Sequence, residues 1–140
     1  MVRTPVITRL DALRLRSLLA SREFRGRNGT PLRAKLDRAR VIDATQLPAD
    51  RVALNSTVLV REAGSNICWI ITLVLPAQAD IKRLRISVAS PLGATLLGAR
   101  VGDLLDCPFS GQSAQLTIEA VRHPRADRLN GSSGDQLLLA

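Results

Sequence analysis

The ionisable and nucleophilic side chains of this 140-residue chain form no familiar catalytic or metal-binding pattern. His123 is the only histidine, and no second histidine, acidic pair or cysteine cluster stands at the spacing of a metal site. A single histidine beside a proline also gives no serine–histidine–aspartate arrangement. Sequences typical of phosphate-binding loops, dinucleotide-binding turns and nucleophile elbows are missing. We therefore predict no catalytic residue, no metal and no cofactor.

The remaining reactive residues have simpler interpretations. Asp103 follows Gly102 at a predicted turn, where an acid usually accepts backbone hydrogen bonds. Cys68 and Cys107 lack motif spacing, which favours two buried, reduced thiols in a cytoplasmic protein. The longest apolar run, at 67–75, is far shorter than the roughly 20 residues of a membrane span, and the N-terminus lacks a signal-peptide core. We expect neither a membrane partner nor a small-molecule substrate.

Positive charge is concentrated in the first third of the chain. The formal net charge is +8, of which residues 1–46 carry +7, residues 47–124 carry +1 and residues 125–140 carry 0. Such a basic segment typically meets nucleic acid, lipid or an acidic protein surface, although a solvated helical face has the same composition. Aromatic residues make up only 2% of the chain, which argues against a stacking platform for single-stranded nucleic acid or sugar.

The elements that position the basic residues are predicted to be two short antiparallel helices within residues 1–46. Thr8 and Asp11 have the spacing of a capping box in front of an apolar stripe that continues to Ala20. Thr30 and Pro31 mark the start of a second helix, which is expected to fade around 43–46.

The tip between these two helices is rich in arginine. Arg22, Arg25 and Arg27 stand there against one acid, Glu23. Phe24 is the only large apolar residue of this segment, and it either folds back onto the helix pair or contacts a partner.

The residues from 52 onward alternate with the period of strands. Strands are predicted around 57–60, 67–75, 84–88, 104–107 and 116–120, with 67–75 central and covered on both faces. Pro108 is expected to stop the fourth of these strands, and residues 110–112 to form the turn into the last. Residues 125–140 are polar and rich in glycine and serine, so we expect a mobile tail.

One short helix is predicted at 92–97. Ser90 is suited to its N-cap, Pro91 to its first position and Gly98 to a left-handed C-terminal closure. Gly93 inside so short a helix costs about 1 kcal/mol relative to alanine, so close packing is the expected reason for it.

The stretch around this helix carries a family resemblance. Residues 90–98 read Ser-Pro-Leu-Gly-Ala-Thr-Leu-Leu-Gly, and Gly102-Asp103 follows. This combination resembles the C-terminal signature of the bacterial Gre transcript-cleavage factors, and the agreement covers most of residues 50–124. The short arms, the Leu36–Ala39 stretch and Asn55-Ser56 are similar to one branch of that family, the regulators of nucleoside diphosphate kinase.

The resemblance implies an α+β fold with three parts. These are a short N-terminal antiparallel helical (coiled-coil) hairpin at 1–46, an FKBP-like antiparallel β-sheet domain with one short helix at 47–124, and the tail at 125–140. It also implies a partner, bacterial RNA polymerase, bound near the rim of the secondary channel. The expected contacts are the tip residues Arg22, Glu23, Phe24, Arg25 and Arg27 together with Ser90, Pro91 and Leu92.

Transcript cleavage is not expected of this chain. Gre factors cleave through acids at the coiled-coil tip, which hold a second magnesium ion in the polymerase active site. Here Glu23 stands among arginines, and the arms are shorter. The resemblance, with these departures, therefore predicts a non-catalytic transcription regulator, with only indirect contact to nucleic acid.

Two other functions stay open at this stage. The first is a basic module that binds nucleic acid through the N-terminal hairpin, and its affinity for bare DNA or RNA would fall steeply with salt. The second, less favoured, is a prolyl isomerase, which turnover of proline peptides would reveal.

Overall fold

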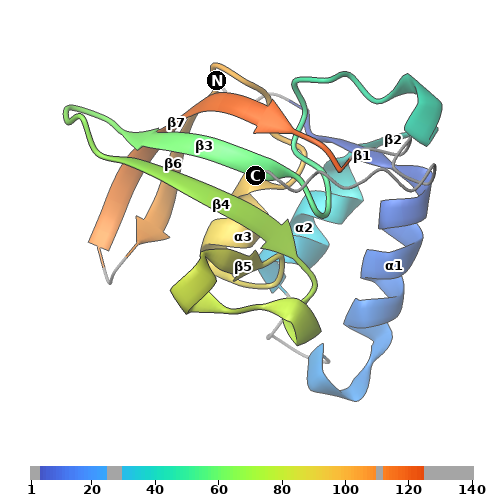
Figure 1. Cartoon of the computed structure of the whole chain (residues 1–140). Coiled ribbons are helices and arrows are strands. Elements are labelled where there is room, and N and C mark those ends of the chain that lie inside the picture. Colours follow the sequence, from blue (N-terminus) through green and yellow to red (C-terminus); the bar gives the residue numbers. More distant parts are fainter. Residues whose placement is uncertain (1–3, 25–29, 110–111, 125–140) are drawn as a thin grey trace, which may run out of the picture.

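A curved five-stranded sheet forms the centre of the computed structural model, which describes residues 4–24, 30–109 and 112–124 (Figure 1). The strands are β3 (Thr57–Glu62), β4 (Cys68–Val74), β5 (Arg85–Ser87), β6 (Leu104–Phe109) and β7 (Gln112–Arg122). They lie in the order β5-β4-β3-β7-β6. The short helix α3 (Pro91–Leu96) lies under one face of this sheet (Figure 1).

The mixed α+β class is confirmed, but the sheet is not purely antiparallel as predicted. The three pairings among β4, β3, β7 and β6 are antiparallel, whereas β5 runs parallel to β4. A parallel neighbour needs a crossover, and residues 75–84 supply it with two short 3-10 turns, Pro76–Gln78 and Ile81–Arg83.

Two details of the predicted strands are wrong. Strand β4 is not covered on both faces, because Ile70 is 62% exposed on the face opposite to buried Ile71. Strand β6 continues through Pro108, which pairs with Ser113. This is possible because β6 is an edge strand, where a missing backbone N–H disrupts no second neighbour. Of the predicted turn at 110–112, residues 110 and 111 lie outside the described residues, and Gln112 is the first residue of β7.

The N-terminal segment contains α1 (Arg9–Ala20), a 3-10 turn (Arg22–Phe24) and α2 (Thr30–Arg38). It also contains two strands that the sequence did not reveal, β1 (Val6–Thr8) and β2 (Arg40–Ile42), which pair in parallel. The second helix therefore ends at Arg38 instead of fading near 43–46, where a 3-10 turn (Ala44–Gln46) follows. Strands of three residues are too short to show a period in sequence.

The start of α1 confirms one half of the predicted capping box. The Thr8 hydroxyl accepts a hydrogen bond from the Asp11 backbone N–H at 3.1 Å. The Asp11 carboxylate is in side-chain hydrogen-bond contact with Thr8, and it also accepts the backbone N–H of Leu54 at 3.1 Å. Asp11 therefore connects α1 to the loop in front of β3.

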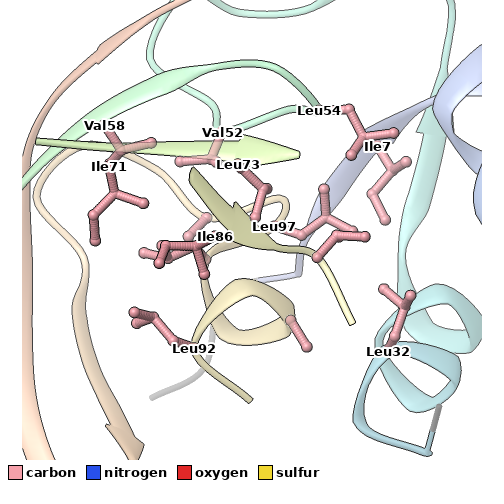
Figure 2. Close-up of a cluster of buried hydrophobic side chains, with 14 of the residues drawn as sticks. Ile7, Leu32, Val52, Leu54, Val58, Ile71, Leu73, Ile86, Leu92 and Leu97 are labelled. Atoms are coloured by element: carbon pink, nitrogen blue, oxygen red, sulfur yellow. The ribbon is translucent and has the colours of Figure 1, made fainter. Parts of the chain in front are cut away.

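The buried side chains of the helices and of the sheet form one cluster. Figure 2 shows Ile7 and Leu32 from the N-terminal segment near Leu54 and Leu97 from the rest of the chain. The contact between α2 and the C-terminal part is direct, because the Lys35 amine donates to the Thr95 carbonyl of α3 at 2.7 Å. The division at residue 47 stays a prediction.

Helix α3 is built as its sequence predicts. The Ser90 hydroxyl accepts the Gly93 N–H at 3.0 Å, and Gly98 has a φ of +80° just after the helix. Leu96 and Leu97 are fully buried. A Cβ on Gly93 would lie only 1.9 Å from the Ser87 carbonyl oxygen, so close packing against the end of β5 explains the glycine.

Candidate partner-binding surface

An apolar groove of about 490 Å³ lies beside the start of α3. The three predicted residues Ser90, Pro91 and Leu92 line one side of it. Trp69 and Ile71 of β4 and a segment that the sequence did not single out form the rest of the wall. The groove is therefore where the predicted contact residues meet the sheet.

The part of the groove wall that the sequence did not reveal is the loop from Ala79 to Leu84. Asp80 and Arg85 exchange backbone hydrogen bonds of 2.9 and 3.0 Å, and Leu84 closes the loop with a φ of +56°. Within the loop, Ile81 is left 71% exposed at the mouth of the groove. The Asp80 carboxylate accepts the backbone N–H of Lys82 at 3.2 Å. Aspartate commonly accepts the N–H two residues further on in a turn, so Asp80 is the sequence signal that could have located this loop.

Ser90 is held in place by its own turn. Its hydroxyl donates to the Ser87 carbonyl at 2.7 Å while it accepts the Gly93 N–H at 3.0 Å. These two hydrogen bonds fix the backbone between β5 and α3, and with it the position of exposed Pro91 at the start of the helix. Among the described residues that line the groove, Arg85 is the one with a charge, and its Nε donates to the Gln78 carbonyl at 3.2 Å. A complementary partner surface would therefore be mainly apolar.

The predicted tip residues are only partly described. Arg22 is exposed, and Phe24 is half-buried against the hydrophobic core, as expected of a ring that folds back onto the helix pair. Arg25 and Arg27 lie outside the described residues, as does the side chain of Glu23. The role of this tip in binding stays a prediction.

Three exposed arginines of α1 each have an acidic neighbour. Arg9 lies 3.2 Å from Asp43. Arg14 and Arg16 each lie 3.8 Å from a carboxylate oxygen, of Asp11 and of Asp37 respectively. The positive charge of this helix is therefore partly compensated on its own surface.

Ser56 and His123 meet where the loop before β3 passes the end of β7. The Ser56 hydroxyl lies 2.9 Å from His123 Nδ1 and accepts the Ala53 N–H at 2.9 Å. Ser56 is fully buried, so its hydroxyl cannot reach an external substrate. Among the residues that the structure describes, no three histidine, cysteine or acidic side chains gather as a metal site.

Cys68 corrects another expectation. Its thiol is free, but Cys68 is exposed and not buried, because it opens β4 on the outer face of the sheet. The side chain of Cys107 lies outside the described residues. Asp103 accepts the Arg100 N–H at 2.9 Å, which confirms the predicted role of a turn acid as a backbone acceptor.

Among the acids of the N-terminal segment, Asp11 is the one whose replacement is expected to lower the stability of the protein most. Burial raises the pKa of the Asp11 carboxyl, although the Leu54 N–H and the Arg14 guanidinium oppose this effect. We expect Asp11→Ala to lower the free energy of unfolding by about 1–3 kcal/mol, since it leaves the Leu54 N–H buried without an acceptor. Asp11→Asn keeps an acceptor oxygen and should cost clearly less in urea unfolding at pH 7. Equal losses in the two variants would contradict this assignment.

Comparison with known proteins identifies the family. The family model described as "Transcription elongation factor, GreA/GreB, C-term" matches residues 47–123. The chain belongs to the GreA/GreB family. The match covers the whole sheet, α3 and the groove, and the resemblance found in the sequence is thereby confirmed. The membership makes this chain a relative of transcription elongation factors.

Individual relatives agree with the branch predicted from the sequence. The Escherichia coli K12 protein named "Regulator of nucleoside diphosphate kinase" is 37% identical over 109 residues, which are 77% of this chain and 80% of that protein. "Transcription elongation factor GreA" of Rhodospirillum rubrum is 39% identical over 85 residues, 61% of this chain. The aligned part is 54% of that GreA, so the chain matches only about half of it.

A solved member of the GreA/GreB family has the same fold. The structure titled "Prokaryotic transcription elongation factor GreA/GreB from Nitrosomonas europaea" superimposes with a TM-score of 0.74 at 34% identity. The superposition covers 86% of this chain and all of the other chain. No helix in the described part of the molecule is long and apolar enough to cross a membrane.

Proposed function

We propose that this chain is a non-catalytic transcription regulator that binds bacterial RNA polymerase near the rim of the secondary channel. The observation that carries the proposal is the apolar groove of the family-matched domain, which Ser90, Pro91 and Leu92 line beside exposed Ile81. Exposed apolar surface bordered by polar residues is characteristic of protein interfaces. The domain is FKBP-like in this proposal, and its contact with polymerase rests on apolar burial more than on charge.

The helices α1 and α2 form, in this proposal, a short hairpin that points into the channel. Twelve residues of α1 and nine of α2 correspond to helices of roughly 18 and 14 Å. So short a hairpin supports steering and occupation of the channel mouth without delivery of a carboxylate pair to the polymerase active site. We therefore expect no stimulated transcript cleavage.

Binding to purified bacterial RNA polymerase tests the proposal directly. Ile81→Glu places a charge at the mouth of the groove and should weaken binding at least about tenfold, since it must be desolvated in an apolar interface. Ile70→Glu is the matched control, because Ile70 is similarly exposed but lies on the opposite face of the sheet. It should change the affinity less than about twofold.

Three outcomes would contradict the proposal. The first is equal weakening by both substitutions, and the second is a lack of competition with a GreA protein for polymerase. The third is transcript cleavage above the intrinsic rate of polymerase. Tight binding of the wild-type chain to bare RNA or DNA that falls steeply with salt would instead support a nucleic-acid-binding module. The ion pairs of Arg9, Arg14 and Arg16 with acids weaken that alternative.

A further inference from the structure

A second cavity, of about 540 Å³, lies on a different side of α3 from the groove. It is open to solvent on one side and is bordered by α2, by the end of α3 and by the first residues of β6. Its lining is polar and apolar in nearly equal parts, and the described residues that line it include four charged ones, Lys35, Arg38, Asp103 and Asp106. A space of this volume is in the range of small-molecule sites.

Lys35 is the buried cation of this cavity. Only 7% of the residue is exposed, and its Nζ donates to the Thr95 carbonyl at 2.7 Å. The chain has 18 arginines and only two lysines, Lys35 and Lys82. Arginine stays protonated at any physiological pH, whereas a lysine can lose its proton when it is buried. Among the lysines and arginines that the structure describes, the one buried position is thus held by the residue type that can become a neutral amine.

The surroundings of Lys35 favour the neutral amine. Burial, together with the positive charge of Arg38, lowers the pKa of Lys35 to about 8, while Asp103 acts in the opposite direction. The two acids of the cavity are themselves engaged. Asp103 accepts the Arg100 N–H at 2.9 Å, and Asp106 accepts from Gln115 Nε2 at 3.0 Å. A desolvated lysine beside a second cation is a recognised way to obtain a nucleophilic amine.

We propose that Lys35 is a site of acylation by small acyl phosphates that enter this cavity. The Nζ lone pair attacks the acyl carbon of the mixed anhydride, and a nitrogen–carbon bond forms. The carbon–oxygen bond to the phosphate breaks, inorganic phosphate leaves with the electron pair, and one amine proton passes to water. The product is a neutral amide whose remaining N–H can still donate to the Thr95 carbonyl.

The class of reagent follows from the charges that line the cavity. Arg38 stands three residues after Lys35 on the same helix, and both line the cavity. A guanidinium there can pair with the phosphate group while the acyl end faces the amine. The amide also removes a charge from a buried position, so acylation relieves the desolvation that the ammonium form suffers.

The test is treatment of the intact protein with acetyl phosphate at pH 7.5, followed by peptide mapping by mass spectrometry. An amine with a pKa near 8 is about one quarter neutral at this pH, whereas an ordinary lysine amine is about one-thousandth neutral. Part of this advantage is lost because a less basic amine is a weaker nucleophile. We expect Lys35 to react about tenfold faster than exposed Lys82, with the order reversing near pH 10.5. In guanidinium chloride the two should react equally.

A second variant separates phosphate recognition from amine reactivity. Arg38→Gln should slow acylation of Lys35 by acetyl phosphate several-fold more than acylation by an uncharged acetyl ester, because only the phosphate pairs with the guanidinium. The ratio of the two rates is unaffected by any change in the neutral fraction of the amine. Faster reaction of Lys82 than of Lys35 at pH 7.5 would overturn the acylation site. An unchanged ratio in Arg38→Gln would overturn the choice of acyl phosphate.

Discussion

Replacement of Gly93 with alanine is expected to destabilise the fold by about 3 kcal/mol, as overpacking against backbone does. The added Cβ would lie 1.9 Å from the Ser87 oxygen and 2.9 Å from the Val88 Cα. Neither is a side chain that can turn aside, so α3 must move away from β5. That movement strains the two hydrogen bonds that the Ser87 carbonyl accepts from Ser90, one from the backbone N–H at 3.1 Å and one from the hydroxyl at 2.7 Å. The free energy of unfolding in urea measures the loss.

Gly64→Ala is the matched control for this substitution. Gly64 has a φ of +78°, and a Cβ there would meet nothing within 4 Å. Its cost is therefore only that of a left-handed alanine, about 1 kcal/mol. Both variants add the same methyl group, so the difference between them reports the contact of α3 with β5. Equal costs would show that α3 is free to shift. Since Ser87 and Ser90 also line the groove, Gly93→Ala should weaken polymerase binding as well.

Lys35→Met is expected to make the protein more stable at pH 7 and to change how stability depends on pH. The folded-state pKa of Lys35 is about 8, against 10.5 for the free side chain. Between these values the unfolded chain binds more protons than the folded one, so wild-type stability should rise as pH increases from 8 to 10.5. The shift corresponds to at most about 3 kcal/mol. After loss of the bond to Thr95, the net gain of the variant at pH 7 should be about 1–2 kcal/mol.

Lys82→Met provides the control for this pH dependence, because Lys82 is exposed. Unfolding in urea is compared at pH 7 and pH 9.5 for the wild type and both variants. The chain has no tyrosine, and its two cysteines are common to all three proteins, so their titration cancels in the comparison. The rise in stability should be present in the wild type and in Lys82→Met and missing in Lys35→Met. A rise of equal size in Lys35→Met would show that Lys35 does not cause it.

The parts of the fold that could be predicted are those specified by neighbouring residues. The cap of α3 at Ser90, the close packing of Gly93 and the left-handed Gly98 follow from local stereochemistry and are all present. The start of α1 at Thr8 is of the same kind. Such signals act over three or four residues, so a sequence shows them without knowledge of the tertiary structure.

The parts that could not be predicted depend on residues far apart in the chain. The pairing of β1 with β2 joins Val6 to Arg40, and the parallel alignment of β5 joins Ile86 to Leu73. The Asp11 carboxylate also accepts the backbone N–H of Leu54, 43 positions away. No local pattern distinguishes these choices, because each is decided by which surfaces become buried together.

The candidate groove shows both situations at once. Ser90, Pro91 and Leu92 were identified because their spacing marks a helix start that resembles a known signature. Ile81 and Trp69 were not, since their part in the groove depends on the crossover that carries the chain from β4 to β5. One side of the groove could therefore be predicted from the sequence, and the rest required the sheet topology.

The parallel pair of β1 and β2 has a consequence for how this architecture can vary in evolution. The chain leaves the body at Thr8 and returns to it at Arg40, and the register Val6↔Arg40 fixes these two points side by side. The helices between these points also contact the body near the strand pair, where Asp11 accepts the Leu54 N–H and Lys35 donates to the Thr95 carbonyl, so any lengthening must occur at their far ends. Equal lengthening of α1 and α2 by whole turns would extend the helical segment by about 5.4 Å per turn and leave the attachment unchanged. The length of the helical segment can therefore change without a change in the groove by which the sheet domain would bind its partner.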